Sequence, residues 1–344
     1  MAFNLMLLAA GAASLLLAGA LAAPGISRRE LAHLGIALVA MAAIAFADSL
    51  DLVILVLLAV GVARAALVGP RDFAVRLRPP VVAASLLAIA LVLARVQGPD
   101  VLARFAAVGL VAGLTAAVGV LPYIHPHDAD ADLEPDAIWI GFLGPVLAAA
   151  VLFRARGLLS PDAGGELGAM LIGIGLLNML WGTLAAWRTR RDSAAWHYSF
   201  MSDWGLVLCG FGITVADGRS AALLVFLCVL LGRFPLLAAA RAVDGPDSTA
   251  DRPINLLLAA MLAGSAPFAG FAARVLLLRG AVEIAWPLAV VLAIGMLLWL
   301  PSSLRLARGL ARPTRRRAVA LAALLAVNAA IGLYPLPILQ AAGS

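Results

Sequence analysis

The stretch Leu262–Arg274, which reads LAGSAPFAGFAAR, decides how the rest of the chain is interpreted. It places Gly264, Pro267 and Gly270, which disfavour a continuous helix, and then Arg274 inside a long apolar run. A charge at mid-bilayer depth costs about 2.5–3.5 kcal/mol on insertion scales, so it marks a functional or a packing site. The stretch therefore predicts an interrupted membrane helix that carries a fixed positive charge.

A second apolar run has the same character. Residues 223–240 read LLVFLCVLLGRFPLLAAA, with Arg233 two residues before the potential helix breaker Pro235. Neither Arg233 nor Arg274 has an acidic partner within its own predicted helix. Two interpretations of these arginines stay open at this point: they bond to carbonyl groups freed by the nearby breakers, or they belong to an ion path.

The composition places the whole chain in a membrane. Of 344 residues, 64% are hydrophobic and 13% are charged, and the mean hydropathy is +1.03. No polar stretch is long enough to form a soluble module, so we predict a single polytopic, all-α membrane domain over residues 1–344. Because about 20 apolar residues cross a bilayer, the sequence predicts about twelve spans: 3–23, 31–47, 52–69, 81–95, 105–122, 138–154, 167–187, 200–215, 220–240, 254–273, 284–300 and 318–335.

The distribution of arginine predicts the topology. All 25 basic residues are arginines; sixteen follow odd-numbered spans and six follow even-numbered ones. The positive-inside rule then places the odd loops in the cytoplasm and both termini outside. The loop over residues 121–136 is an exception to this pattern, because it follows an odd-numbered span but is acidic and has no arginine. The net charge of +6 is thus explained by topology, with the lipid bilayer as a partner and no nucleic acid.

Titratable groups are sparse within the predicted spans. Every carboxylate falls in a loop or near a span end, with Asp203 and Glu283 nearest to the membrane interior, and no histidine lies mid-span. Asn178 is the best-placed neutral polar residue, and helix packing accounts for it adequately. The loop over residues 121–136 has two histidines among five carboxylates, which permits a metal site, but a solvated acidic loop is the better interpretation. We expect no metal site.

Several stretches resemble segments of a known family, and they follow one another along the chain in the same order as in that family. LAGSAPFAGFAAR is similar to a family segment that reads roughly LAGLPPLAGFxGK, and VFLCVLLGRFPLLAAA is similar to HxLxKALLFLxAG. Residues 196–212, WHYSFMSDWGLVLCGFG, resemble AYSSISQLGLVLLGLG. Residues 121–137 and 47–69 resemble a proline loop and the fifth helix of the same family. The chain thus resembles, over about residues 36–335, the antiporter-like membrane subunits of respiratory complex I, membrane-bound hydrogenases and Mrp-type cation/proton antiporters.

The resemblance implies an antiporter-like fold with interrupted helices, and it puts Arg233 and Arg274 at two family lysine positions. Elsewhere the chain departs from the family. Two further family lysines fall at Thr115 and near Val146, and the fifth-helix glutamate falls near Val60. We therefore expect a structural subunit, or one impaired in proton translocation.

The resemblance also implies a location and partners. It favours the inner membrane of a prokaryote and the other membrane subunits of a complex I-like assembly, of the NADH–quinone oxidoreductase or hydrogenase type. No flavin, iron–sulfur or quinone motif is visible, so we expect no cofactor and no catalytic residue in this chain. Two alternatives stay open: a free-standing cation/proton antiporter, and a membrane partner of a carbon dioxide-hydrating protein. Asn178, Asp203 and Thr115 are the candidate polar lining of any path.

Overall fold

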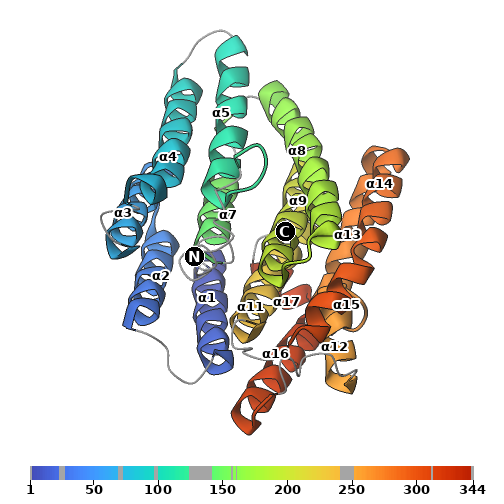
Figure 1. The fold of residues 1–344 in the computed structure, drawn as a ribbon. Helices are drawn as coiled ribbons and strands as arrows, with labels where there is room; N and C mark the ends of the chain where they lie inside the picture. The colour runs from blue at the N-terminus through green and yellow to red at the C-terminus, as the bar shows by residue number, and fades with distance from the viewer. Residues whose placement is uncertain are drawn as a thin grey trace. The chain divides into compact units, whose positions relative to one another are not determined.

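The computed structural model describes residues 2–22, 28–68, 73–96, 100–123, 142–155, 158–159, 161–240, 252–310 and 313–341. Within these ranges the chain forms helices and short connections, without a strand (Figure 1). This is the architecture that a bilayer imposes, because a helix satisfies its backbone hydrogen bonds within its own segment. The predicted all-α membrane fold is confirmed. The acidic part of the loop over residues 121–136, from residue 124 onward, lies outside the described residues.

Eight segments of the described chain are long and apolar enough to cross a membrane, so this is a multi-pass membrane protein. They are Asn4–Leu21, Leu50–Leu67, Phe73–Arg95, Asp100–Val118, Pro161–Arg188, Ala216–Ala240, Trp286–Arg308 and Arg315–Leu333. The remaining predicted spans are shorter or more polar helices, so the number twelve stays a prediction.

The chain divides into two compact units, residues 27–174 and residues 1–26 with 175–344. The prediction of one membrane domain is not tested by this division. Unit 2, residues 27–174, contains α2 (Arg28–Phe46), α3 (Leu50–Val68), α4 (Phe73–Arg95), α5 (Asp100–Val118), α7 (Gly144–Arg154) and the first part of α8 (Pro161–Arg188).

Helices α4 and α5 of unit 2 lie side by side in close contact (Figure 1). A Cβ atom on Gly113 would lie 2.6 Å from Cγ of Leu87, so glycine is what permits this approach. At the end of α7, the guanidinium of Arg154 donates hydrogen bonds to the backbone oxygens of Ile44 and Ala47, at 2.9 and 2.8 Å. It thereby adds a charged donor to carbonyl groups at the end of α2, where the regular helical hydrogen bonds end.

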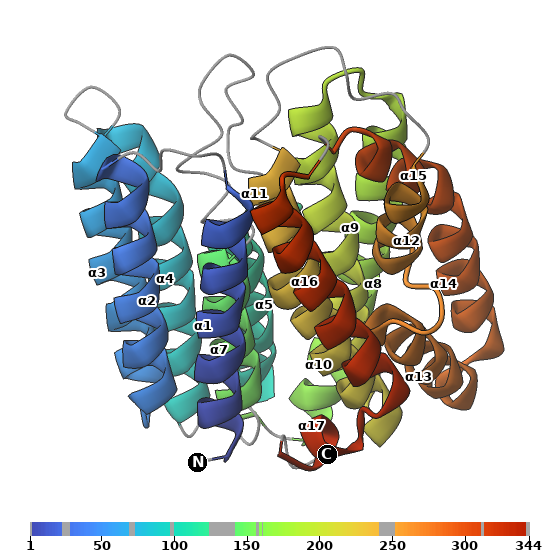
Figure 2. The ribbon, with the colours of Figure 1, turned by 90° about the horizontal axis from the view of Figure 1, so that it is seen from below.

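Unit 1 holds the remaining helices. These are α1 (Ala2–Leu21), the rest of α8, α9 (Asp192–Gly212), α10 (Ala216–Cys228), α11 (Phe234–Ala240), α12 (Pro253–Leu262), α13 (Ala269–Ile284), α14 (Trp286–Leu298), α15 (Leu300–Arg308), α16 (Arg315–Leu333) and α17 (Leu336–Ala341). Helix α1 packs against both α11 and α16 (Figure 2). Glycines permit a close crossing of α8 and α9, since a Cβ atom on Gly205 would lie 2.4 Å from the backbone nitrogen of Met179.

The two segments singled out by their breakers differ in how they are interrupted. Helices α10 and α11 are joined by a π-helical turn, Val229–Arg233, so the chain stays helical through Pro235. In contrast, the predicted span 254–273 is two helices, α12 and α13, separated by a non-helical connection over residues 263–268. Gly264 and Pro267 lie in this connection, and Gly270 lies in the first turn of α13.

Candidate functional site

Asp203 lies near the middle of a helix and not near its start. The helix that contains the predicted span 200–215 is α9, which begins at Asp192, so both Asp203 and His197 lie inside it, and both are buried. The polar residues of the first half of α9 lower its local hydropathy and hid its start. Burial of a carboxylate requires a partner, and the structure provides one.

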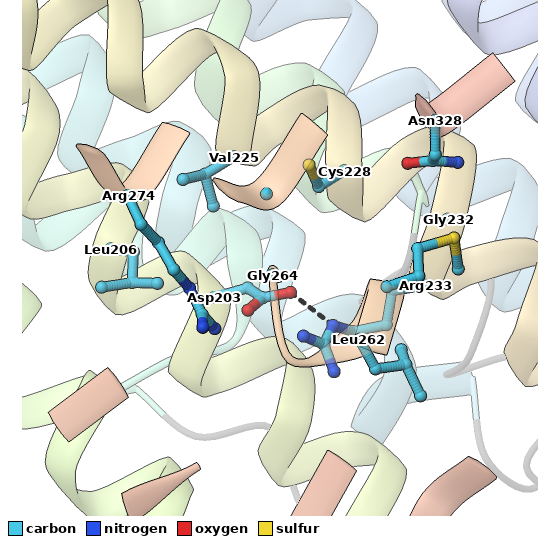
Figure 3. A pocket seen from close by; sticks show the side chains of 12 residues that line it. Asp203, Leu206, Val225, Cys228, Gly232, Arg233, Leu262, Gly264, Arg274 and Asn328 are labelled. Atoms are coloured by element: carbon cyan, nitrogen blue, oxygen red, sulfur yellow. Dashed lines mark hydrogen bonds and ion pairs between the residues drawn. The ribbon is translucent and has the colours of Figure 1, made fainter. Parts of the chain in front are cut away.

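That partner is Arg233, in the π-helical turn between α10 and α11. Its Nε donates a hydrogen bond to Oδ2 of Asp203, and the side chains are 4% and 9% exposed (Figure 3). The guanidinium also lies 5.0 Å from the ring centre of Trp299, within the range of a cation–π interaction. The pair joins residues thirty positions apart in the sequence. Of the partners considered for Arg233, the structure therefore shows a carboxylate from another helix and not a carbonyl group freed by a nearby breaker.

Arg274 makes the other kind of contact considered from the sequence. Its Nη1 donates a hydrogen bond to the backbone oxygen of Ala263, in the connection between α12 and α13. Gly264 makes room for this side chain: it has a φ of +65°, and a Cβ atom there would lie 2.6 Å from Nε of Arg274. Gly270 permits the same tight packing, since its Cβ atom would lie 2.7 Å from Cα of Gly264. The breakers therefore shape the backbone around the guanidinium.

These groups surround one cavity of about 30 Å³. Its lining comes from α9, α10, the π-helical turn, the α12–α13 segment and α16: Asp203, Leu206, Val225, Cys228, Gly232, Arg233, Met261, Leu262, Gly264, Gly270, Arg274 and Asn328 (Figure 3). Asn328 was missed in the sequence, although an amide inside an apolar run was a visible signal. Its Nδ2 donates to the backbone oxygen of Leu231, at 3.2 Å, within the π-helical turn. Cys228 and Trp299 gave no such signal, because apolar packing explains both.

The other predicted polar residues lie elsewhere. Asn178 is buried in α8. Thr115 is buried in α5 of unit 2, and its hydroxyl donates to the backbone oxygen of Ala112 at 3.0 Å. Val60 and Val146 are buried as well; the resemblance puts the family glutamate near the first and one family lysine near the second. Of the residues described in unit 2, the buried polar ones are His33, Arg64 and Thr115.

Two further points concern charge and metals. Arg64, on α3, is only 3% exposed and has interaction partners. Among the described residues, no group of three or more histidine, cysteine, aspartate or glutamate side chains is arranged to hold a metal ion. The acidic loop from residue 124 to 136 is outside that search.

Comparison with known proteins finds similar structures but no similar sequence. No family model and no curated protein matches the chain. A chain of respiratory complex I from Thermus thermophilus is matched with a TM-score of 0.78 at 16% identity, over 99% of this chain and 83% of the other. A chain of the Mrp complex from Dietzia sp. is matched with a TM-score of 0.78 at 16% identity, over 99% and 44%.

A chain of the membrane-bound sulfane sulfur reductase, an archaeal respiratory membrane complex, is matched with a TM-score of 0.78 at 17% identity. That match covers 96% of this chain and 64% of the other, so the chain spans less than two thirds of the length of the Mrp and sulfane sulfur reductase chains. Identities this low establish the fold alone. The chain therefore shares the fold of membrane chains in these three complexes, which confirms the antiporter-like fold that its sequence resembles.

Proposed function

We propose that this chain is an antiporter-like membrane subunit of a complex I-like assembly, of the NADH–quinone oxidoreductase or hydrogenase type. Its role there is structural, or it carries an impaired form of proton translocation. The observation that carries the proposal is a fold match over nearly the whole chain to membrane chains of two respiratory complexes. Catalysis and cofactors belong, in this proposal, to partner subunits.

The lack of titratable side chains at three positions of unit 2 supports an impaired proton path. In the antiporter-like family that the sequence resembles, one lysine falls at Thr115 of this chain, another near Val146, and a glutamate near Val60. Valine has no proton to transfer, and the Thr115 hydroxyl already donates to a backbone oxygen. A proton path through unit 2 by these positions therefore has no titratable group at any of the three.

Unit 1 has a charged cluster, which we define as Asp203, Arg233 and Arg274. An arginine stays protonated at physiological pH, whereas a lysine can lose its proton when it is buried. The carboxylate of Asp203 is held by Arg233, so neither member of this pair is readily released to carry a proton. We propose that the cluster acts as a fixed electrostatic element that holds α9, the π-helical turn and the α12–α13 connection together.

The proposed location is the inner membrane of a prokaryote, with both termini on the outer side, as the arginine distribution predicts. In this arrangement the arginine-rich connection that precedes α16 is cytoplasmic. The orientation is tested with single cysteines introduced at the exposed positions Arg190 and Glu283. Each variant is treated with a membrane-impermeant thiol reagent. Preferential labelling of the first position from outside intact cells contradicts it.

Purification of the native assembly tests the proposed function. The chain is tagged in cells that express it, extracted from membranes with a mild detergent, and its partners are identified by mass spectrometry. Several membrane subunits in fixed stoichiometry with a redox subunit support the proposal. A lone monomer refutes it, and co-purification with a soluble carbon dioxide-hydrating zinc protein favours that alternative.

A free-standing cation/proton antiporter is the second candidate, because the fold is shared with a chain of an Mrp complex and Asp203 is a buried carboxylate. The two candidates differ in what the purified chain does alone. Proteoliposomes that contain only this chain should show no cation-driven change in internal pH. Robust activity that is abolished by Arg274→Ala, but not by Arg279→Ala on the same helix, reverses the ranking.

A further inference from the structure

The cavity in unit 1 has more positive than negative charge around it. Two guanidinium groups, of Arg233 and Arg274, line it, and of its described lining residues Asp203 alone carries a carboxylate. Asp203 accepts a hydrogen bond from Arg233. Arg274 interacts electrostatically with both, but it donates its hydrogen bond to a neutral carbonyl group, that of Ala263. The formal charge of the cluster is therefore +1.

The donors of the cluster also exceed its acceptors. A guanidinium has five N–H donors and no acceptor. Nη1 of Arg233 is buried, in a side chain that is 4% exposed, and has no hydrogen-bond partner among the described residues. A buried N–H without a partner and a buried charge without a counterion are both strongly unfavourable in a membrane protein. Both deficits are corrected by the same kind of ligand, a small acceptor with a negative charge.

The size of the cavity is compatible with a small ligand. A volume of about 30 Å³ has room for roughly two water-sized particles, at about 10–15 Å³ each. A monatomic anion, which is close to a water molecule in size, fits this space. We propose that the cavity binds one halide-class monovalent anion, held by the guanidinium groups of Arg233 and Arg274. This site goes beyond the proposed function and does not rest on it.

The anion completes the electrostatics of the cluster. With the anion bound, two positive charges face two negative ones, and the unpaired N–H group on Nη1 of Arg233 gains an acceptor. Its position beside the α12–α13 connection means that it stabilises the backbone that Gly264 and Ala263 form around Arg274. We therefore expect the anion to stabilise the folded chain rather than to be transported.

A halide titration tests the site. The purified chain is reconstituted in lipid nanodiscs, and its Tm is followed by tryptophan fluorescence while chloride replaces gluconate at constant ionic strength. A ligand that binds only the folded state raises Tm in a saturable way, so we expect a rise that reaches a plateau with chloride and with bromide. Crystals grown in bromide should show one anomalous peak between the two guanidinium groups.

Three variants separate this site from general salt effects. Arg274→Gln makes the cluster neutral and should abolish the dependence of Tm on chloride. Asp203→Asn raises the formal charge to +2 and should lower the chloride concentration at half-maximal effect several-fold. Arg279→Gln is the matched control: it removes an exposed arginine of α13 that pairs with Asp217, and it should leave the chloride dependence unchanged.

Two results overturn the proposal. One is a Tm that is equal in chloride and gluconate together with no bromide peak at the cavity, which would mean that water alone occupies it. The other is a chloride dependence that persists in Arg274→Gln. The titration and the bromide experiment use the unaltered chain, so the test remains decisive even if a variant fails to fold.

Discussion

Replacement of Asp203 by asparagine should destabilise the protein strongly, because it removes the carboxylate from a buried ion pair. The side chains of Asp203 and Arg233 are 9% and 4% exposed, so bulk water cannot replace the carboxylate as the partner of the guanidinium. Removal of one partner from a buried pair costs about 3–5 kcal/mol, most of which is the penalty of the remaining unpaired charge. Here Arg274 adds a second positive charge to the same cavity, so we expect the upper half of that range.

The double variant Asp203→Asn/Arg233→Gln should recover part of this loss. It removes both charges of the pair, and a buried pair that is replaced as a whole by neutral groups is often close to neutral in stability. The free energy of unfolding of the double variant should therefore be higher than that of Asp203→Asn alone. The coupling energy between the two positions should be at least about 1 kcal/mol, as is typical of residues in direct contact.

The assay is reversible unfolding in mixed micelles, followed by tryptophan fluorescence, in gluconate buffer so that halide cannot compensate. Asp51→Asn is the matched control, since Asp51 pairs with Arg95 and their side chains are 47% and 55% exposed, and exposed pairs contribute little. If Asp203→Asn is no more destabilising than this control, or if the two substitutions of the double variant are simply additive, the buried pair does not have the role assigned to it.

Three further predictions concern the packing of the backbone, each checked by the same unfolding measurement. Gly264→Ala should destabilise by about 1–3 kcal/mol because of the positive φ at this position, whereas Gly35→Ala, which meets no neighbouring atom, should not destabilise. Gly205→Ala should cost about 1–3 kcal/mol through overpacking of the α8–α9 crossing; an unchanged stability would mean that the crossing is looser than described. Arg154→Gln should cost about 1–3 kcal/mol, because backbone carbonyl groups at the end of α2 lose a charged donor; a change in stability no greater than that of Gly35→Ala would count against this contact.

The sequence alone determined the fold class and the place where the fold is interrupted. Hydropathy is a property of local composition, so the apolar runs and the breakers Gly264 and Pro267 predicted membrane helices and the break between α12 and α13. The order of several weak motifs was sufficient to identify the antiporter-like fold. These features depend on residues that are neighbours in the chain, so a single sequence contains them.

The charged cluster was decided only by the tertiary structure. Arg233 and Arg274 were identified from the sequence, but Asp203 was placed near the start of a span and had no visible partner. A hydropathy criterion treats every residue as if it faced lipid. It therefore placed the start of the predicted span after most of the polar residues in the first half of α9. In the folded chain the carboxylate faces Arg233, thirty residues away in sequence. The pairing makes its burial tolerable, and pairing between helices is a property that no local pattern specifies.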